Sequence, residues 1–418
     1  MTNTPVNQLV DHLFRHESGK MVAVLSRLLG LQNLETAQDI VQDTLLKAMN
    51  AWSFGQLPEN PSAWLYRVAQ NQAIDFLRKK KKFRQLSPQY AYLLESEWTL
   101  SPTVNNLFLE NEIQDSQLRM MFACCHPAIP EESQVALTLK VLCGLSVEEI
   151  AKAFLSSEET ISKRIYRARE KIRAENIEPD VPAAGQLPAR LDVVLKSLYL
   201  LFNEGYNSSH PDQLIREDLC AESIRLCHLL THQSFTSYPR VKALLALMCF
   251  QSSRLTARLD DNNQIILLKY QDRSKWHRDL VQKGLDYLEE AAEPFEISTY
   301  HFEAAIASIH AVAPTFEETD WKSIYHLYEM LYQLQPNPVV AMNKAIASSY
   351  AISKQKALDE LHIIKGLDHH HLYHASIGEI YLDMGNKQKA LEYFQKAFGL
   401  TPSQVEQQLL LYKISLCN

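Results

Sequence analysis

The chain has 418 residues with 42 basic and 49 acidic side chains, a net charge of -7 and only 11 glycines. This length predicts two or three domains rather than one. Scarce glycine and recurring Ala-, Leu-, Lys- and Glu-rich windows favour helices, so we expect an all-α protein.

Cysteine usage and hydropathy exclude two broad classes of protein. The seven cysteines include no Cys-x-x-Cys pair, and their odd total is typical of a reduced cytosolic protein rather than a disulfide-linked secreted one. The N-terminus lacks a basic segment followed by an apolar one, and no apolar run approaches the roughly 18 residues of a membrane span. We therefore expect a soluble, cytoplasmic protein that makes no contact with a membrane.

Charge is distributed unevenly along the chain. Residues 1–176 carry 20 basic and 20 acidic side chains, whereas residues 177–418 carry 22 and 29, so the negative net charge belongs to the C-terminal part. Twelve of the 20 N-terminal basic residues lie at 78–84 and 163–173. Such clusters are typical of proteins that contact nucleic acid.

Helical periodicity divides the chain into three parts. Helices are predicted at 9–29, 35–51 and 60–82, and a second helical group at 112–175. Ser-Pro occurs twice in the polar segment between these groups, and three prolines and a glycine follow the second group, which indicates linkers. We expect domains at 1–83, 112–176 and 190–418, joined by linkers at 84–111 and 177–189.

The predicted helix at 35–51 is amphipathic. Its apolar side carries Val41 and Leu45, and its opposite side carries Asp39, Gln42 and Asp43. This polar face either docks on a basic protein partner or is simply hydrated.

The predicted helix at 60–82 begins with Asn60 as N-cap and Pro61 in the first turn. A polar stripe along it runs into four consecutive lysines; its members are Arg67, Asn71, Asp75 and Arg78. Aromatic residues lie near the start of the helix or shortly before it: Trp52, Phe54, Trp64 and Tyr66. Aromatic rings beside cations suit unstacked, single-stranded bases. Core packing of Trp64 and a solvated lysine tail are the alternative.

Residues 145–173 have the spacing of a helix-turn-helix. Two S-x-x-E capping boxes, Ser146 with Glu149 and Ser156 with Glu159, start helices ten residues apart. The second helix has a predicted buried stripe formed by Ile161, Ile165, Ala168 and Ile172. Its other side presents Lys163, Tyr166, Arg167 and Arg169. A basic face of this kind suits the major groove of DNA, and a solvated helix of a bundle is the alternative.

Taken in this order, three segments resemble bacterial sigma factors of the extracytoplasmic-function (ECF) type. "AQDIVQDTLLKAMNAW" is similar to their polymerase-binding helix, and "NPSAWLYRVAQNQAIDFLRKKKK" to the helix that captures the -10 element. "LSVEEIAKAFLSSEETISKRIYRAREKIR" resembles the module that reads the -35 element. The resemblance covers residues 5–176 and implies two helical sigma domains, region 2 and region 4.

The resemblance also implies roles for individual residues. By resemblance, Asp39, Gln42 and Asp43 would dock on the clamp helices of the largest subunit of core RNA polymerase. Gln38 occupies a position where the family commonly has Glu. Partly single-stranded promoter DNA at the -10 element would be held by Phe54, Arg67, Asn71, Arg78 and Lys79. The -35 element would be contacted by Thr160, through phosphate, and by Ser162, Lys163, Tyr166 and Arg167.

The C-terminal part carries a second pattern. "ASIGEIYLDMGNKQKALEYFQKAFGLTP" fits the tetratricopeptide repeat (TPR), with Gly378, Tyr381, Gly385, Ala390, Phe394, Ala397 and Pro402 at the expected offsets. Looser copies upstream place TPR-like repeats at about 321–410, because a lone repeat cannot bury its faces.

The region between the second linker and these repeats resembles the sigma-factor group with a TPR-like C-terminal extension. Its distinctive polar residues are Asn203, Glu204, Tyr206, Arg216, Glu217, Asp218, Asp272 and Arg273, together with Trp276. They form either a pocket or contact surface for a protein or small-molecule partner that regulates the sigma domains, or a buried polar network that holds helices in register.

No motif indicates catalysis or a cofactor. Phosphate-loop, His-Glu-x-x-His and Gly-x-Ser-x-Gly patterns are absent from the sequence. Two stretches could be taken for metal sites: "FACCHPAIPEES" at 122–133 and "DHHHLYH" at 368–374. We interpret the first as packing at a helix junction and the second as the boundary between two repeats, and expect no metal.

The sequence therefore predicts a sigma factor that recognises -35 and -10 elements. A helix-turn-helix activator with a TPR sensor is the alternative, and an interaction scaffold without promoter activity is a third. The first 83 residues separate them, because an activator needs neither a polymerase-docking face nor a helix for melted DNA.

Overall fold

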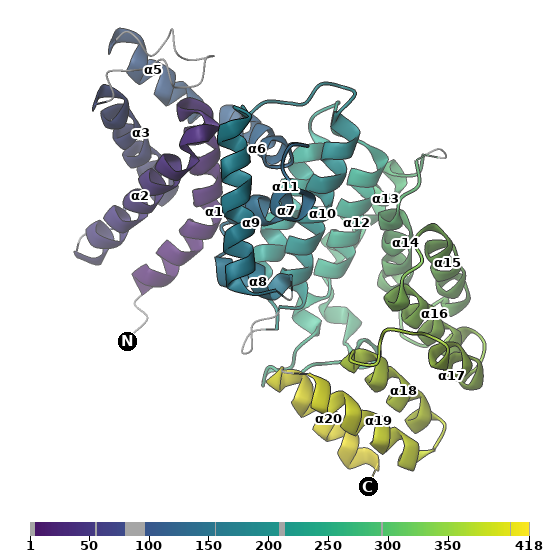
Figure 1. Cartoon of the computed structure of the whole chain (residues 1–418). Coiled ribbons are helices and arrows are strands. Elements are labelled where there is room, and N and C mark those ends of the chain that lie inside the picture. Colours follow the sequence, from purple (N-terminus) through teal and green to yellow (C-terminus); the bar gives the residue numbers. More distant parts are fainter. Residues whose placement is uncertain are drawn as a thin grey trace. The chain divides into compact units, whose positions relative to one another are not determined.

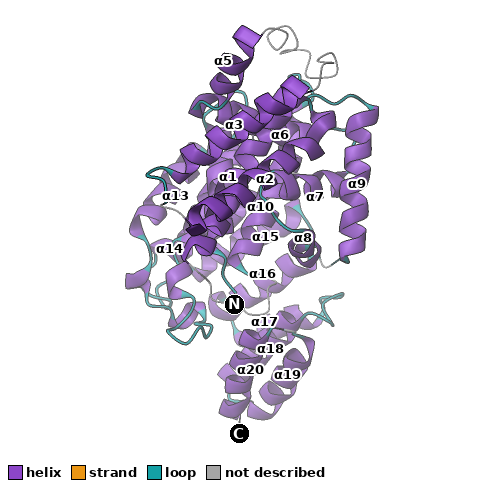
Figure 2. Ribbon diagram, turned by 90° about the vertical axis from the view of Figure 1, so that its left-hand side faces the viewer, coloured by secondary structure: helices purple, strands orange, loops and turns teal. Residues whose placement is uncertain are grey.

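The computed structural model describes residues 5–54, 57–79, 97–154, 156–208, 214–293, 296–401 and 403–417. Within these ranges the regular elements are helices, apart from one isolated bridge between Leu259 and Ile265 (Figures 1 and 2). The predicted all-α fold is confirmed. The chain forms two compact units, Met1–Leu201 and Phe202–Asn418, which we call the N-terminal unit and the C-terminal unit.

The N-terminal unit begins with α1 (Pro5–Leu29), α2 (Leu34–Phe54) and α3 (Pro61–Lys79). Gly30 turns the chain between α1 and the 3-10 helix η1 (Leu31–Asn33) with φ of 83°, a value that favours glycine. The Asn60 side chain accepts a hydrogen bond of 2.9 Å from the Ala63 amide, as its predicted role of N-cap requires. Helix α2 packs against both α1 and α3.

A helix lies in the segment that we predicted to be a linker. Residues 84–111 contain α5 (Glu97–Leu107), while residues 80–96 lie outside the described ranges. Leu100, Val104 and Leu107 are buried along one side of α5, which packs against α3. Burial of this stripe stabilises the helix despite Pro102 within it. The aperiodic polar composition of the whole segment concealed it.

The second helical group contains α6 (Glu110–Cys124), α7 (Glu131–Val141), α8 (Val147–Ala153) and α9 (Glu158–Ala174). Helix α9 packs against α7 and α8, and α10 (Leu187–Tyr206) follows.

Helix α1 also packs against this second group. The buried guanidinium of Arg27 lies 2.9 Å from carboxylate oxygens of both Glu112 and Asp115 on α6. A Cβ atom on Gly19 would lie 2.1 Å from the Leu142 carbonyl oxygen, so the backbones meet there only because residue 19 is glycine. The two helical groups therefore form one packed unit.

The C-terminal unit is a succession of helices. They are α11 (Glu217–Thr231), α12 (Pro239–Ser252), α13 (Arg278–Glu290), α14 (Thr299–Val312), α15 (Trp321–Leu334), α16 (Pro338–Ala351), α17 (Lys354–His362), α18 (His371–Asp383), α19 (Lys387–Leu400) and α20 (Gln404–Cys417). Each packs against the next, and further packing joins α12 to α14 and α16 to α18 (Figure 1). Contacts between near neighbours in sequence are typical of stacked helical hairpins.

The hairpin of α18 and α19 is held together by a glycine and an aromatic ring. A Cβ atom on Gly378 would lie 2.8 Å from the ring of Phe394, so glycine allows the close approach of the two helices. Phe394, Ala390 and Ala397 are all fully buried, and Gly385 makes the turn with φ of 78°. The spacing of small and aromatic residues thus predicted this hairpin, although Pro402 lies outside the described residues.

Candidate functional site

The exposed side of α2 carries the three residues predicted to dock on a protein partner: Asp39, Gln42 and Asp43. None of them pairs with another side chain in the part of the chain that the structure describes. Two carboxylates and an amide are therefore available to a partner that carries basic groups.

Leu46 lies in the middle of the same face, and we did not predict it. At 100° per residue, positions 39, 42, 43 and 46 share one stripe of the helix. Leu46 is 56% exposed, and Met49 beside it is also exposed. An exposed leucine among polar residues provides an apolar anchor, and the helical position of residue 46 could have revealed it.

Helix α3 presents the predicted polar stripe to solvent. Its members Arg67, Asn71, Asp75 and Arg78 are all exposed, as is the neighbouring Lys79. Arg78 lies 3.9 Å from Asp75 in a pair of exposed side chains, which DNA phosphates can replace at little cost. The side chain of Phe54 lies outside the described residues.

The aromatic residues near α3 pack inside the unit. Trp52 is buried, and its ring centroid lies 5.3 Å from that of Trp64. The Tyr66 hydroxyl donates to Glu17, and the Tyr66 ring lies 5.8 Å from that of Phe108. Burial removes Trp52 from a stacking platform for bases, whereas Trp64 and Tyr66 are half-buried and pack against one ring each.

The helix-turn-helix of α8 and α9 forms with one correction at its second cap. Ser146 and Glu149 form the predicted capping box, with bonds of 3.1 and 2.6 Å. The N-cap of α9 is Ser157, whose hydroxyl accepts from the Thr160 amide at 3.2 Å. The predicted cap at Ser156 is wrong by one residue, because its amide donates to the Ala151 carbonyl at the end of α8.

Helix α9 has the predicted buried stripe, formed by Ile161, Ile165, Ala168 and Ile172. The predicted -35 residues on its other side are exposed: Ser162, Lys163, Tyr166 and Arg167. Tyr166 is 63% exposed, and the Arg167 guanidinium has no partner among the described residues. Thr160 is half-buried, and its hydroxyl shares a hydrogen bond of 2.9 Å with that of Ser157.

The C-terminal end of α9 contacts the N-terminal end of α2. The Arg169 guanidinium donates to the Gln38 side chain at 2.7 Å and lies 3.3 Å from Glu35. Arg173 pairs with the same Glu35 at 2.8 Å. Gln38 immediately precedes Asp39, so α9 lies next to the acidic face of α2.

The two cysteines of "FACCHPAIPEES" lie buried where α6 ends. Burial raises the pKa of both thiols, that of Cys125 to about 12, so they are neutral. Arg190 donates to the carbonyl oxygens of Phe122, at 2.6 Å, and Cys125, at 3.3 Å, which satisfies the end of α6. These neutral thiols fill a helix junction, as we predicted.

The histidines of "DHHHLYH" bond to neighbouring groups. The His374 ring lies 2.8 Å from the Asp368 carbonyl, and His371 lies 3.1 Å from Glu406. Across the described residues, no group of three His, Cys, Asp or Glu side chains could hold a metal ion. Nor does any helix within those residues have the length and apolar character of a membrane span.

The predicted polar residues of the C-terminal unit differ in burial. Glu204, Arg216 and Arg273 are buried, and Tyr206 is half-buried. Asn203, Glu217 and Asp272 are exposed.

The buried members bond mainly to backbone and to nearby side chains. Arg273 donates to the His310 and Ala313 carbonyls, and its guanidinium lies 4.9 Å from the Trp276 ring centroid. Glu204 accepts from the Ser208 hydroxyl at 3.1 Å. A structural network accounts for the buried residues better than a pocket, whereas Glu217, Asp218 and Trp276 of the predicted set line cavities of this unit.

Known protein families match three separate segments of the chain. Residues 13–83 match Sigma-70 region 2, and residues 119–172 match Sigma-70, region 4. Residues 190–292 match a family of unknown function, DUF6596.

Three similar proteins cover different shares of this chain. An uncharacterised protein of Rhizobium meliloti (strain 1021) is 34% identical over 378 residues, which cover 90% of this chain and 88% of the relative. The ECF RNA polymerase sigma factor SigW of Bacillus subtilis (strain 168) is 30% identical over 166 residues, covering 37% of this chain and 82% of SigW. The ECF RNA polymerase sigma-E factor of Escherichia coli (strain K12) is 32% identical over 139 residues, which cover 32% of this chain and 70% of the sigma-E factor.

Proposed function

Because the chain belongs to the ECF family of RNA polymerase sigma factors, we propose that it binds core RNA polymerase and directs initiation at promoters with -35 and -10 elements. One observation carries the proposal: three helices, α2, α3 and α9, each present an exposed polar face that has the side chains such a task needs. The chemistry of RNA synthesis remains with the polymerase.

The face of α2 would bind the clamp helices of the largest polymerase subunit. Asp39 and Asp43 supply negative charge for basic groups of the clamp, and Gln42 supplies a neutral hydrogen-bonding group. Leu46, at the centre of the face, would be desolvated on docking and contribute most of the apolar burial.

Helix α3 would hold the -10 element after the strands separate. Asn71 can bond the edge of a flipped base, together with Phe54, and Arg67, Arg78 and Lys79 would neutralise the strand backbone.

Helix α9 would enter the major groove at the -35 element. Arg167 reaches solvent without a partner in the described part of the chain, so it can bond a base edge without first breaking an ion pair. Thr160 at the first turn would contact phosphate, where the helix dipole favours negative charge, and Ser162, Lys163 and Tyr166 share the face of Arg167.

Promoter binding requires α9 to leave α2. Elements centred at -35 and -10 are separated by more than two turns of DNA, at about 3.4 Å per base pair. In this structure, Arg169 and Arg173 hold α9 against Glu35 at the end of α2. We infer that the N-terminal unit opens on the promoter, and the distance between labels on α3 and α9 should lengthen when holoenzyme binds.

We further propose that the helices from α15 to α19, within the range of about 321–410, form TPR-like repeats that regulate the sigma regions. The buried residues at the repeat positions and the packing of each helix on the next support this. A chain truncated after Leu201, at the boundary of the two units, tests this proposal. It is the longer chain that keeps Arg190 on the end of α6, whereas truncation after Asp180 would remove that contact. Unchanged promoter output from the longer chain would argue against regulation.

Dependence of DNA binding on core polymerase separates a sigma factor from an activator. Footprints on promoter fragments should need both this protein and core enzyme, and should include melted bases near -10. A footprint of equal strength without core enzyme would favour the helix-turn-helix activator instead. The match to region 2 counts against that alternative, since an activator does not use one.

A further inference from the structure

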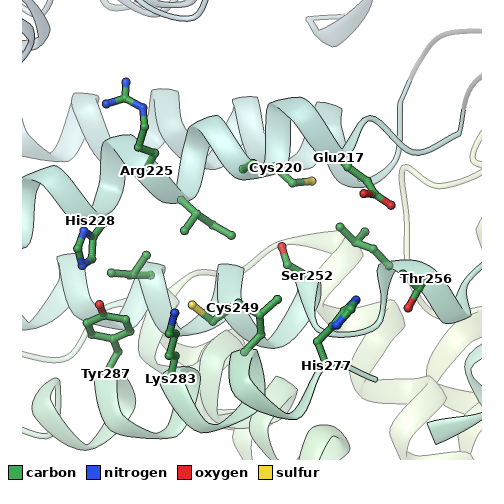
Figure 3. A pocket seen from close by; sticks show the side chains of 15 residues that line it. Glu217, Cys220, Arg225, His228, Cys249, Ser252, Thr256, His277, Lys283 and Tyr287 are labelled. Atoms are coloured by element: carbon green, nitrogen blue, oxygen red, sulfur yellow. The ribbon is translucent and has the colours of Figure 1, made fainter. Parts of the chain in front are cut away.

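A cavity lies in the C-terminal unit among α11, α12, α13 and the segment after α12. Its volume is about 560 Å³, and it falls within the residues that match the family of unknown function. Pockets for small organic molecules usually enclose about 300–1,000 Å³. The cavity is therefore large enough for a metabolite, and Figure 3 shows side chains entering it from opposite sides.

The middle of the cavity is apolar. Aliphatic side chains form most of it: Ala221, Ile224, Leu245, Leu255 and Leu280. Cys220 and Cys249 are buried, and burial raises the pKa of each thiol to about 12. Both thiols are thus neutral and behave as small apolar groups, so this region suits the apolar body of a ligand.

Three hydrogen-bond donors meet at one end of the cavity, from His228, Lys283 and Tyr287 (Figure 3). The Lys283 ammonium has no ion-pair or hydrogen-bond partner within the described ranges. Burial lowers the pKa of His228, with His232 and Lys283 adding to the effect, so its ring is neutral at neutral pH.

Lys283 is the one unpaired cation at this end among the described residues. The Arg225 guanidinium pairs with Glu222 at 2.8 Å and points away from the cavity in Figure 3. Burial raises the pKa of the Tyr287 phenol, which therefore stays protonated and can donate. One ammonium and two neutral donors form a suitable site for an anionic group.

A buried hydroxyl between the two ends lacks a partner. Ser252 is only 6% exposed, and its Oγ atom makes no hydrogen bond with any described residue. Figure 3 shows this oxygen directed into the cavity. A buried polar atom without a partner is unfavourable unless water or a ligand satisfies it, so Ser252 independently indicates an occupant with a polar atom there.

The opposite end carries Glu217, Thr256 and His277. Glu217 and His228 are 11 positions apart on α11, about 16 Å at 1.5 Å per residue. The acidic and basic ends are thus too far apart to neutralise one another, and a ligand's charged head would bind at one end only.

We propose that this cavity binds a small organic acid, whose anionic head contacts Lys283, His228 and Tyr287 and whose apolar body lies along the middle of the cavity. Ser252 would bond a polar substituent on that body. The inference concerns binding by the C-terminal unit and goes beyond promoter recognition, so a failure of the sigma function would leave it standing.

Calorimetric titration of the full-length protein with octanoate, octanol and octylammonium tests the charge preference. All three probes share one apolar chain and differ in head group. Octanoate should bind about tenfold more tightly than octanol, since one charge-assisted hydrogen bond has about that effect, and octylammonium should bind most weakly. Equal affinities, or no octanoate binding at millimolar concentration, would overturn the proposal.

Two substitutions locate the site. Lys283→Gln should weaken octanoate binding about tenfold and leave octanol binding unchanged, because it removes only the charge. Lys275→Gln removes the same charge from an exposed residue that does not line the cavity, and should leave both unchanged.

Ala221→Phe would fill the apolar middle and should abolish binding of all three probes. Thermal unfolding of each variant checks that it folds. If Ala221→Phe folds normally and still binds octanoate, or if the Lys283 and Lys275 variants behave alike, the cavity is not the site.

Discussion

Two arginines, one from each unit, have opposite roles. On α9 of the N-terminal unit, Arg167 extends into solvent with no partner in the described part of the chain. In the C-terminal unit, Arg273 is buried and donates to two backbone carbonyls. Arg167 is therefore available to another molecule, whereas the charge and donors of Arg273 hold α14 in place. The exposure and the hydrogen bonds of an arginine, rather than its residue type, therefore distinguish a role in recognition from a role in holding the fold.

A buried and an exposed aromatic residue, one from each unit, should show the largest difference in their effect on stability. Phe394→Ala removes a fully buried ring from between α18 and α19 and should lower the free energy of unfolding by about 3–5 kcal/mol. Tyr166→Ala, at a 63% exposed position, should change it by less than about 0.5 kcal/mol. Chemical denaturation of the full chain measures both, and equal losses would contradict the assignment of Tyr166 to a free face.

Arg273→Ala should destabilise the protein by about 2–3 kcal/mol, because it leaves the carbonyls of His310 and Ala313 without a donor. Arg278→Ala is the matched control, since Arg278 is exposed and should have an effect within about 0.5 kcal/mol. Thermal unfolding compares the two variants. A stable Arg273 variant with altered promoter output would restore the predicted functional role of this residue.

Arg167→Ala should cost about 1–3 kcal/mol of binding at the -35 element if the guanidinium reads a base edge. Stability should be unchanged, because the side chain has no bond to lose within the described residues. Competition between promoter variants measures the loss base by base. A loss of equal size on every sequence would instead assign Arg167 to a phosphate.

Leu46→Ala should weaken binding to core polymerase by about 1 kcal/mol, since roughly half of the leucine surface is available for burial on docking. Lys47→Ala, also exposed and on the next position of α2, serves as the control. Fluorescence anisotropy with labelled protein gives both affinities. If only Lys47→Ala weakens binding, the docking face lies on a different side of α2.

The sequence predicts helices and their buried stripes well where the signal is local. The capping box of Ser146 and Glu149 and the buried isoleucines of α9 follow from spacing alone. The predicted cap of α9 was displaced by one residue because two serines are adjacent, and the bond from the Ser156 amide to the Ala151 carbonyl at the end of α8 decides between them. Helix α5 was missed because its stability comes from packing on α3.

The candidate sites could likewise be predicted only where their residues share one helix. Residues at the predicted faces of α2, α3 and α9 share single helices, so periodicity places them together. The cavity that contains Ser252 and Lys283 draws its lining from three different helices and the segment after α12, and no periodicity within one helix connects them. Leu46 was missed although its helical position places it among Asp39, Gln42 and Asp43, because an apolar residue is commonly assigned to the core.

Run-off transcription with purified core RNA polymerase tests the central claim most directly. Templates drawn from a genomic library should include a small set on which this protein and core enzyme together yield transcripts of defined length, and core enzyme alone does not. Arg167→Ala should reduce those transcripts in proportion to its loss of -35 binding. If no template yields transcription above that of core enzyme alone, the chain does not act as a sigma factor.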